Sequence, residues 1–405
     1  MLRTLGPKNR LLMLSLFVWA SSVGLWYNQR QLYLSELGAS PKQIGTALAL
    51  ESVCAALLLI PAGLLSDRIG PRRVILGSWS MGIFGVMLMA MARSWQAAIP
   101  GLVIYRLAAA SAPALLSFAL LNIPDRRVPL ISEKTLTTVF TAWPAAHILS
   151  PWLGGIIAQQ TSIRTTLWVA VGVFALGIGL MLLTKPVAPG WFANRQSPLE
   201  LFRNRRFLLL VGYFALATIA MFVGQLLLPN FLHEMRGFSL ATIGVLFSIF
   251  SVGAVACNLV VGRSRPKWTF VGLLAVIWLA YYALLQTTGV GPAVVGLFLL
   301  GAISSTWVVM SAGISRVVKE RNQGQAFGVM ESLIMGASAV AAWLAGQLYG
   351  LTPARTLPLL AALAGVSVML VLWFLLRLGP LVASSGMPEQ EPGTCALPEP
   401  LPGDD

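Results

Sequence analysis

Twelve long apolar segments, separated by mostly short polar connections, run along this 405-residue chain. A helix needs about 20 mostly apolar residues to cross the hydrocarbon core of a bilayer. Only 10% of the residues are charged, against roughly 25% in soluble domains, so the chain lacks the polar surface of a water-soluble body. The sequence predicts an all-α membrane protein with twelve transmembrane helices. The expected spans cover residues 11–34, 43–65, 74–92, 97–121, 136–159, 166–184, 207–232, 240–262, 269–287, 292–315, 325–349 and 356–377.

Along the chain, connections that are rich in lysine and arginine alternate with connections that are poor in them. With the N-terminus inside, 21 of the 28 basic residues fall in inner segments and 5 in outer loops. Because cytoplasmic loops are enriched in Lys and Arg, both termini are predicted in the cytoplasm, in a plasma membrane of the prokaryotic inner-membrane type. The formal charge of +14 is spread in short clusters between apolar stretches, which argues against a nucleic-acid partner.

The chain repeats itself at an offset close to half its length. Residues Leu37–Gly45 match Arg236–Gly244 at an offset of 199, and Trp152–Gly155 match Trp343–Gly346 at an offset of 191. The matches keep their order and their topological positions, so two related six-helix halves are predicted. We expect an N-terminal six-helix bundle over 1–184, a cytoplasmic linker over 185–206, a C-terminal six-helix bundle over 207–378 and a disordered, acidic, Pro-rich tail over 379–405.

A basic turn follows the second predicted span. Gly70 and Pro71 reverse the chain between two helices, and the neighbouring arginines hold the loop on the cytoplasmic face. The segment resembles the loop between the second and third helices of the major facilitator superfamily. That resemblance implies two pseudo-symmetric six-helix bundles that rock around a central site, and a gating role for this loop. The residues that carry the resemblance are Gly63, Asp67, Arg68, Gly70, Arg72 and Arg73.

Two further segments resemble motifs of the same family. Arg106 in the fourth span is similar to an arginine that proton-coupled members use near the proton path, although Ala109 and Ala110 replace the usual Gln-Gly. The fifth span resembles a signature of drug-efflux antiporters, with Ser150 in place of its first glycine. Generic close packing of helices is the other reading of the fifth-span segment. Its matching residues are Ser150, Pro151, Gly154 and Gly155.

Four ionisable residues fall within the predicted spans. Charges inside a membrane are costly, so they usually face the bundle interior and have partners. Glu51 and Arg106 lie at similar depths in the second and fourth spans, and we predict that they interact, either as a proton-coupling pair or as a fixed structural ion pair. Arg30 either attracts an anionic substrate or extends to the outer interface. Glu331, near the cytoplasm, is a gate residue or is exposed at the interface.

Polar and aromatic residues in the spans are the candidates for a substrate cavity. The tryptophans among them have packing or interfacial anchoring as their alternative role. His147 in particular is either a group that titrates near neutral pH or a hydrogen-bonded packing residue. The candidates are Trp26, Asn28, Arg30, Trp143, His147, Gln225, Asn230 and Trp307.

These features predict a transporter and not an enzyme, because no ATP-binding loop, metal cluster or catalytic nucleophile is found. The favoured hypothesis is a proton-coupled antiporter that exports small amphipathic or hydrophobic compounds as a monomer, without a cofactor. The alternative is a symporter or facilitator that imports a small polar or anionic solute. A non-transporting receptor is a third class, which the intact Asp67 loop disfavours.

Overall fold

The computed structural model describes residues 6–122, 138–185, 203–261, 266–286, 289–318, 323–376 and 378–379. The described part of the chain is helical and contains no strand. Most of the predicted linker and almost all of the predicted tail lie outside these ranges. The N-terminal half contains α1 (Pro7–Trp26), η2 (Tyr27–Gln29), α2 (Arg30–Glu36), α3 (Pro41–Ile69), α4 (Pro71–Met91), α5 (Trp95–Tyr105), η3 (Arg106–Ala110), α6 (Ser111–Leu121), α8 (Ala142–Gln160) and α9 (Ile163–Leu182). The C-terminal half contains α11 (Arg205–Gln225), α12 (Leu228–Asn230), η4 (Phe231–Met235), α13 (Leu240–Val261), α14 (Pro266–Leu285), α15 (Val290–Leu300), α16 (Ala302–Val317), α17 (Gln323–Tyr349) and α18 (Leu357–Leu375).

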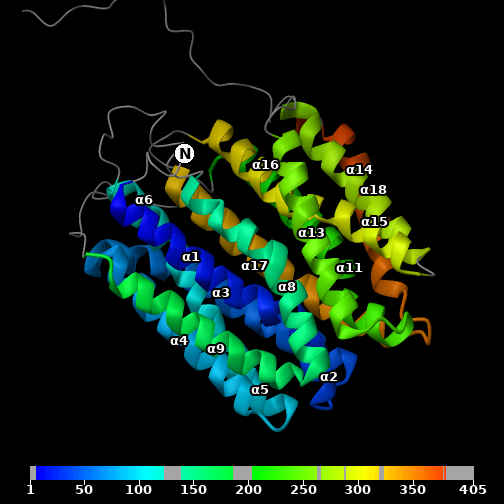
Figure 1. Cartoon of the computed structure of the whole chain (residues 1–405). Coiled ribbons are helices and arrows are strands. Elements are labelled where there is room, and N and C mark those ends of the chain that lie inside the picture. The colour runs from blue at the N-terminus through cyan, green and yellow to red at the C-terminus, as the bar shows by residue number, and fades with distance from the viewer. Residues whose placement is uncertain are drawn as a thin grey trace, which may run out of the picture.

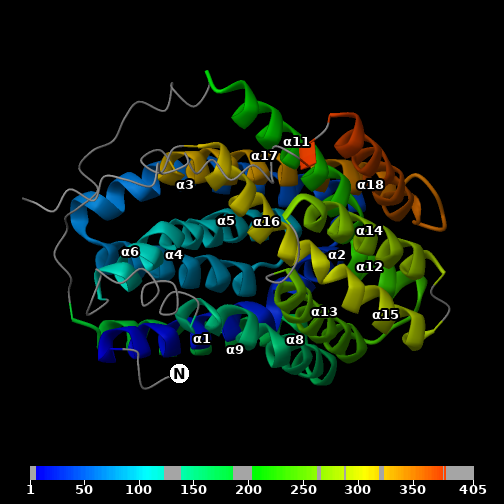
Figure 2. The same ribbon diagram turned by 90° about the horizontal axis from the view of Figure 1, so that it is seen from above.

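The long apolar helices make this chain a multi-pass integral membrane protein. Within the described ranges, nine helical segments are long and apolar enough to cross a bilayer. The three other predicted spans coincide with α3, with the broken helix α5–η3–α6, and with α8. The helices form two bundles that lie side by side, one from each half of the sequence (Figures 1 and 2). We call the end of the molecule that carries the N-terminus the inner end, and the opposite end the outer end.

Buried polar contacts and stacked rings hold α1 inside the N-terminal bundle. Ser15 and Ser22 donate hydrogen bonds of 2.7 Å to the carbonyl oxygens of Gly177 and Ala170 on α9. Trp19 stacks on Trp79 of α4, with 4.4 Å between the ring centroids. These contacts fix the rotation of α1, and so fix which of its residues face the other half.

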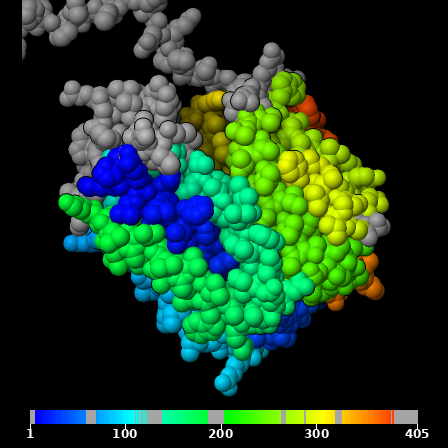
Figure 3. All heavy atoms as spheres, viewed as in Figure 1, coloured from blue at the N-terminus to red at the C-terminus, as the bar shows by residue number. Residues whose placement is uncertain are grey.

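Two pairs of helices join the halves. Helix α3 packs along α17, and α8 packs along α13. On the face shown in Figure 3, the surfaces of the two halves meet along α8 and α13. Hydrogen bonds that cross between the halves include Gln31 Nε2 to the Leu226 carbonyl at 2.9 Å, and the Ala241 amide to Gln159 Oε1 at 3.0 Å. Both lie toward the outer end of their helices.

Glycines bring these helices into backbone contact at the outer end. A Cβ placed on Gly45 of α3 would lie 2.6 Å from the Cα of Gly346 on α17. A Cβ on Gly155 of α8 would lie 3.0 Å from the Cα of Gly244 on α13. The sequence repeat aligns Gly45 with Gly244 and Gly155 with Gly346, so the two contacts are related by the internal pseudo-symmetry. The helix pairs α3–α17 and α8–α13 are therefore in close backbone contact toward the outer end.

Candidate functional site

One carboxylate lies between two guanidinium groups in the N-terminal bundle. Glu51 Oε2 is 3.4 Å from Arg30 Nε, and Glu51 Oε1 is 3.5 Å from Arg106 Nε. The exposed fractions of the side chains are 2% for Glu51, 7% for Arg30 and 18% for Arg106. The predicted contact between Glu51 and Arg106 is present. Arg30 is buried against the same carboxylate, so it does not extend to the outer interface.

Breaks in two helices supply the arginines. The first membrane span changes from α-helix to a 3₁₀ turn over Tyr27–Gln29, and Arg30 follows as the first residue of α2. The fourth span changes in the same way over Arg106–Ala110, and Arg106 opens the break. A 3₁₀ turn winds more tightly than an α-helix, so it rotates the side chains that follow it. The turn at Tyr27–Gln29 therefore sets the direction of Arg30, whereas Arg106 begins its own turn. Both arginines reach the uninterrupted helix α3 and its Glu51.

Tyr27 completes this cluster. The guanidinium carbon of Arg30 lies 3.6 Å from the centroid of the Tyr27 ring, and Arg30 Nη1 donates a 2.7 Å hydrogen bond to the Tyr27 carbonyl. Arg106 Nη1 donates to the Tyr27 hydroxyl at 3.4 Å. With both arginines protonated and Glu51 ionised, the cluster carries a surplus of one positive charge. Tyr27 disperses part of that charge through its ring and its two oxygens.

Arg106 also touches the other half of the molecule. Its Nη2 lies 3.4 Å from Sδ of Met335 on α17. Glu331 precedes Met335 by four residues, so the two side chains lie on one face of α17, one turn apart. The Trp307 indole of α16 donates a hydrogen bond to the Glu331 carboxylate. Glu331 is thus held by a neighbour in its own half, one turn from the contact that Arg106 makes.

Comparison with known proteins identifies the family. The model of the Major Facilitator Superfamily matches residues 11–304 and 237–397. The chain belongs to the major facilitator superfamily. A curated relative is the inner membrane transport protein YajR of Escherichia coli (strain K12), 26% identical over 160 residues. That alignment spans 40% of this chain and 34% of the relative, so the chain matches about a third of the relative's length.

Solved structures share the superfamily fold. A point mutant of the nucleoside transporter NupG superposes with a TM-score of 0.78 at 14% identity, covering 92% of this chain and 99% of that one. A POT family transporter in complex with 5-aminolevulinic acid gives 0.74 at 13% identity, covering 94% and 99%. The human organic anion transporter MFSD10 gives 0.65 at 16% identity, covering 92% and 100%. At these identities the likeness concerns the fold alone.

The superfamily loop joins α3 to α4. Gly63, Asp67 and Arg68 belong to α3, and their side chains lie outside the described part of the structure. Gly70 has a φ of 91°, a conformation that glycine adopts readily, and Pro71 begins α4.

The two arginines of this loop differ in their surroundings. Arg72 donates to the Leu182 carbonyl at 2.8 Å and to Thr184 Oγ1 at 3.2 Å, which ties the loop to the end of α9. Arg73 is exposed.

The fifth-span motif lies where α8 meets α1 and α13. Ser150 is buried and donates to the Ala146 carbonyl at 2.7 Å. A Cβ on Gly154 would lie 1.8 Å from the Leu25 carbonyl oxygen of α1, and Gly155 faces α13. The carbonyl oxygen of Pro151 lies close to Gly244 of α13. The segment therefore serves close packing within its half and across the halves.

The other candidates for the cavity separate into buried and accessible groups. Trp26 is fully buried, with its ring centroid 4.8 Å from that of Tyr105, and its place in a substrate cavity stays a prediction. A 3₁₀ turn follows it and turns Tyr27 toward the arginines in its place. Asn28 and Gln225 are half-buried. Trp143 is exposed and packs against His147, whose Nδ1 lies 2.9 Å from the Trp143 carbonyl.

One accessible face belongs to α16. Helices α11, α13, α14 and α17 of the same half contact α16, and Figure 2 shows it near the centre of the molecule. Trp307 and Val308 are 52% and 42% exposed on this otherwise enclosed helix, and Ser304 and Ala312 are exposed beside them. The exposed stripe is therefore turned toward the N-terminal half. It presents an indole, small apolar groups and one hydroxyl.

Sequence reasoning missed three parts of the site. Tyr27 carries no charge, and Met335 is one of many apolar residues, so nothing in the sequence marks them as partners of Arg106. The third part is an ion pair at the outer end, between Glu234 and Arg355. Its signal was an acidic residue two positions beyond the predicted seventh span, facing a lone basic residue in an outer loop.

Proposed function

We propose that this protein is a proton-coupled antiporter that moves small amphipathic compounds across the membrane by alternating access, in the direction of export. The observation that carries the proposal is the burial of Glu51 between Arg30 and Arg106. The charge of this carboxylate decides whether two separate helix breaks are held against α3. The proposal includes cytoplasmic termini, as the distribution of basic residues indicates.

The coupling step follows from the charges. Ionised Glu51 holds both arginines, and Arg106 at the same time contacts Met335 of the other half. When Glu51 takes up a proton, its attraction for Arg106 falls and the guanidinium needs another anionic partner, because an unpaired charge inside a membrane is costly. Glu331 lies one turn from Met335 on the same face. We infer that Arg106 changes its carboxylate partner as the halves rock.

The substrate class follows from the accessible face of α16. Trp307 and Val308 offer apolar contact, while Ser304 and Glu331 add only a few polar groups. Binding sites for small molecules are mostly apolar, with a few polar groups that set orientation. This face suits an amphipathic compound better than a strongly hydrated one such as a sugar.

Proteoliposomes with an imposed pH gradient test the proposal. A panel of fluorescent amphipathic compounds is added one at a time, and an internal pH dye reports proton movement. We expect at least one compound to dissipate the gradient with the wild type. Glu51→Gln keeps the size of the side chain and removes its carboxylate, so gradient-driven transport should stop while exchange of the compound persists. Glu36→Gln, on the exposed end of α2, is the matched control. Unchanged gradient-driven transport by the Glu51 variant contradicts the proposal.

The surplus positive charge of the cluster favours a second function, the uptake of a small anion. In that case the bound anion neutralises the one positive charge of the two arginines that Glu51 does not balance. Arg30→Gln should then abolish transport of the anion, and a pH gradient should have no effect on the wild-type rate. Under proton antiport, the same gradient drives accumulation of the transported compound. The two functions are therefore separated by one measurement on the wild type.

A further inference from the structure

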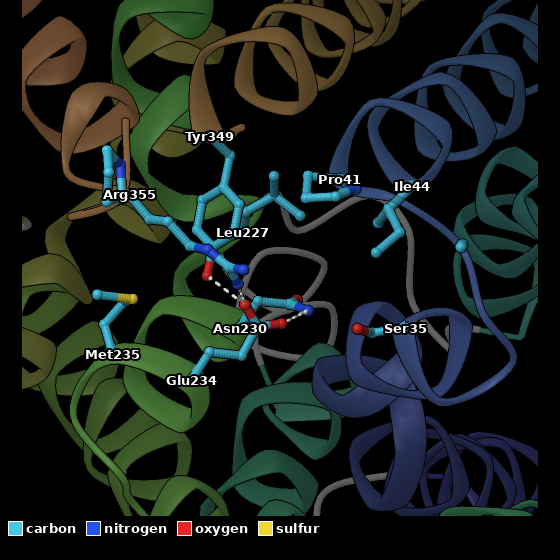
Figure 4. Close-up of a pocket in the computed structure, with 11 residues that line it drawn as sticks. Ser35, Pro41, Ile44, Leu227, Asn230, Glu234, Met235, Tyr349 and Arg355 are labelled. Carbon is cyan, nitrogen blue, oxygen red and sulfur yellow. Dashed lines mark hydrogen bonds and ion pairs between the residues drawn. The ribbon is translucent and has the colours of Figure 1, made fainter. Parts of the chain in front are cut away.

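A cavity of about 420 Å³ opens at the outer end, between the halves and away from Glu51. Its volume falls within the range of roughly 300–1,000 Å³ that is typical of small-molecule sites. One wall belongs to the N-terminal half and the other to the C-terminal half (Figure 4). The lining residues used below are Ser35, Ala39, Pro41 and Ile44 on the first wall, and Asn230, Glu234, Tyr349 and Arg355 on the second.

The polar groups of the second wall converge on one carboxylate. Glu234 forms an ion pair with Arg355 and accepts a hydrogen bond from the Tyr349 hydroxyl at 3.2 Å. Asn230 Nδ2 donates to Glu234 at 3.3 Å. Figure 4 shows these groups pointing toward one another from three separate segments. The arrangement fixes the carboxylate of Glu234 at the edge of the cavity.

One acceptor oxygen is left over at this site. The Asn230 side chain is 1% exposed, yet its Oδ1 has no hydrogen-bond partner among the described residues. Because buried polar atoms are normally paired, this oxygen marks a place for a donor. Ser35 adds a hydroxyl, and Ala39, Pro41 and Ile44 form an apolar wall opposite. A ligand that matches these groups has N–H donors at one end and an apolar body at the other.

Arg355 holds the position that such a donor would take. Its backbone φ is 51°, a left-handed conformation that non-glycine residues adopt at a cost in strain. Its side chain is 35% exposed, and its guanidinium carbon lies 5.2 Å from the centroid of the Tyr349 ring. A partly exposed cation on a strained loop can be displaced from a carboxylate by a cation that is free in solution.

We propose that this outer cavity binds a small organic amine in its ammonium form. The ammonium group contacts Glu234 and the free Asn230 Oδ1, the ring of Tyr349 flanks the charge, and the apolar body lies against Ala39, Pro41 and Ile44. Arg355 acts as a tethered competitor that leaves Glu234 when the amine binds. The site is separate from the proton-coupling cluster, and the proposal holds whichever ion drives transport.

Calorimetric titration of the full chain in detergent tests this site, with benzylamine as the probe. Benzyl alcohol and benzoate are the neutral and anionic controls of similar shape. We expect benzylamine alone to bind. Glu234→Gln should weaken the binding about tenfold, because a charge-assisted hydrogen bond is lost. Arg355→Gly removes the competitor and tolerates the positive φ, so it should tighten the binding about threefold. Arg93→Gly, an exposed outer arginine elsewhere, should leave the affinity unchanged.

A steric variant keeps the test valid should Glu234→Gln not fold. Ala39→Phe places a ring in the cavity from the opposite wall and should abolish benzylamine binding. Three results overturn the proposal. The first is no binding of benzylamine to the wild type. The second is binding that neither Glu234→Gln nor Ala39→Phe changes. The third is binding of benzoate that Arg355→Gly abolishes, which would make the cavity an anion site.

Discussion

Replacing Gly45 by alanine should open the outer end. The added Cβ would lie 2.6 Å from both the Ala342 carbonyl oxygen and the Gly346 Cα, about 0.8 Å closer than an ordinary van der Waals contact of 3.4 Å. Both neighbours are backbone atoms, so they cannot turn aside as a side chain would. The helices α3 and α17 must separate to accept the methyl group. The substitution therefore acts selectively on the state in which these outer ends are closed.

The magnitude follows from the cost of overpacking. An extra methylene in a well-packed interior costs about 1–3 kcal/mol. Since about 1.4 kcal/mol corresponds to a tenfold change in an equilibrium constant, the balance between outer-closed and outer-open forms should shift by about 5- to 150-fold. A shift of this size is large enough to change the populations seen in a distance measurement.

Spin labels at Arg93 and Val290 provide the assay, because both residues are exposed and lie at the outer ends of opposite halves. The three native cysteines are first replaced, namely Cys54, Cys257 and Cys395. In Gly45→Ala, the distance distribution measured by pulsed electron resonance should gain a longer component. Gly336→Ala on the same helix α17 is the matched control, because a Cβ there meets nothing within 4 Å. Equal distributions in wild type and Gly45→Ala, or equal shifts in both variants, refute the reasoning.

Three further expectations use the same structure. Gly244→Ala brings a Cβ within 2.4 Å of the Pro151 carbonyl oxygen, so the same label pair should report opening, and no change would argue against the pseudo-symmetric contact. Tyr27→Phe removes the acceptor of Arg106 but keeps the ring under Arg30, and gradient-driven transport should slow while folding, read by thermal stability, is retained. Ser22→Ala should lower stability by about 0.6–1.5 kcal/mol in a detergent melt, against little change for Ser21→Ala, whose hydroxyl bonds only within its own helix.

Hydropathy and charge contain most of the information on architecture. The segments expected to span the membrane coincide with the observed helices to within a few residues, because an apolar run of fixed length has few alternatives in lipid. The repeat at Gly45 and Gly155 also indicated which positions are equivalent. It did not indicate that they pair crosswise between the halves, because equivalence in sequence says nothing about which helices touch.

The charged cluster was predictable only in part. Depth along a straight helix was enough to bring Glu51 and Arg106 to the same level. The place of Arg30 depends on the 3₁₀ turn at Tyr27–Gln29, which changes the rotation of every residue after it, and helical periodicity cannot locate such a turn. The sequence places the charges of Glu234 and Arg355 at the outer end but does not indicate that they pair. The pair forms between the end of one span and a loop, where neither depth nor periodicity applies.

The crosswise glycine contacts make the interface between the halves nearly self-complementary. Position 45 of one half meets the counterpart of position 155 in the other, and position 155 meets the counterpart of position 45. This is the pattern of an isologous dimer interface, in which a patch i contacts a patch j and j contacts i. Two copies of the N-terminal bundle would carry both of the glycines that each contact requires. A single ancestral bundle with this pair of glycines would thus have held the means to associate with itself before the two halves were joined in one chain.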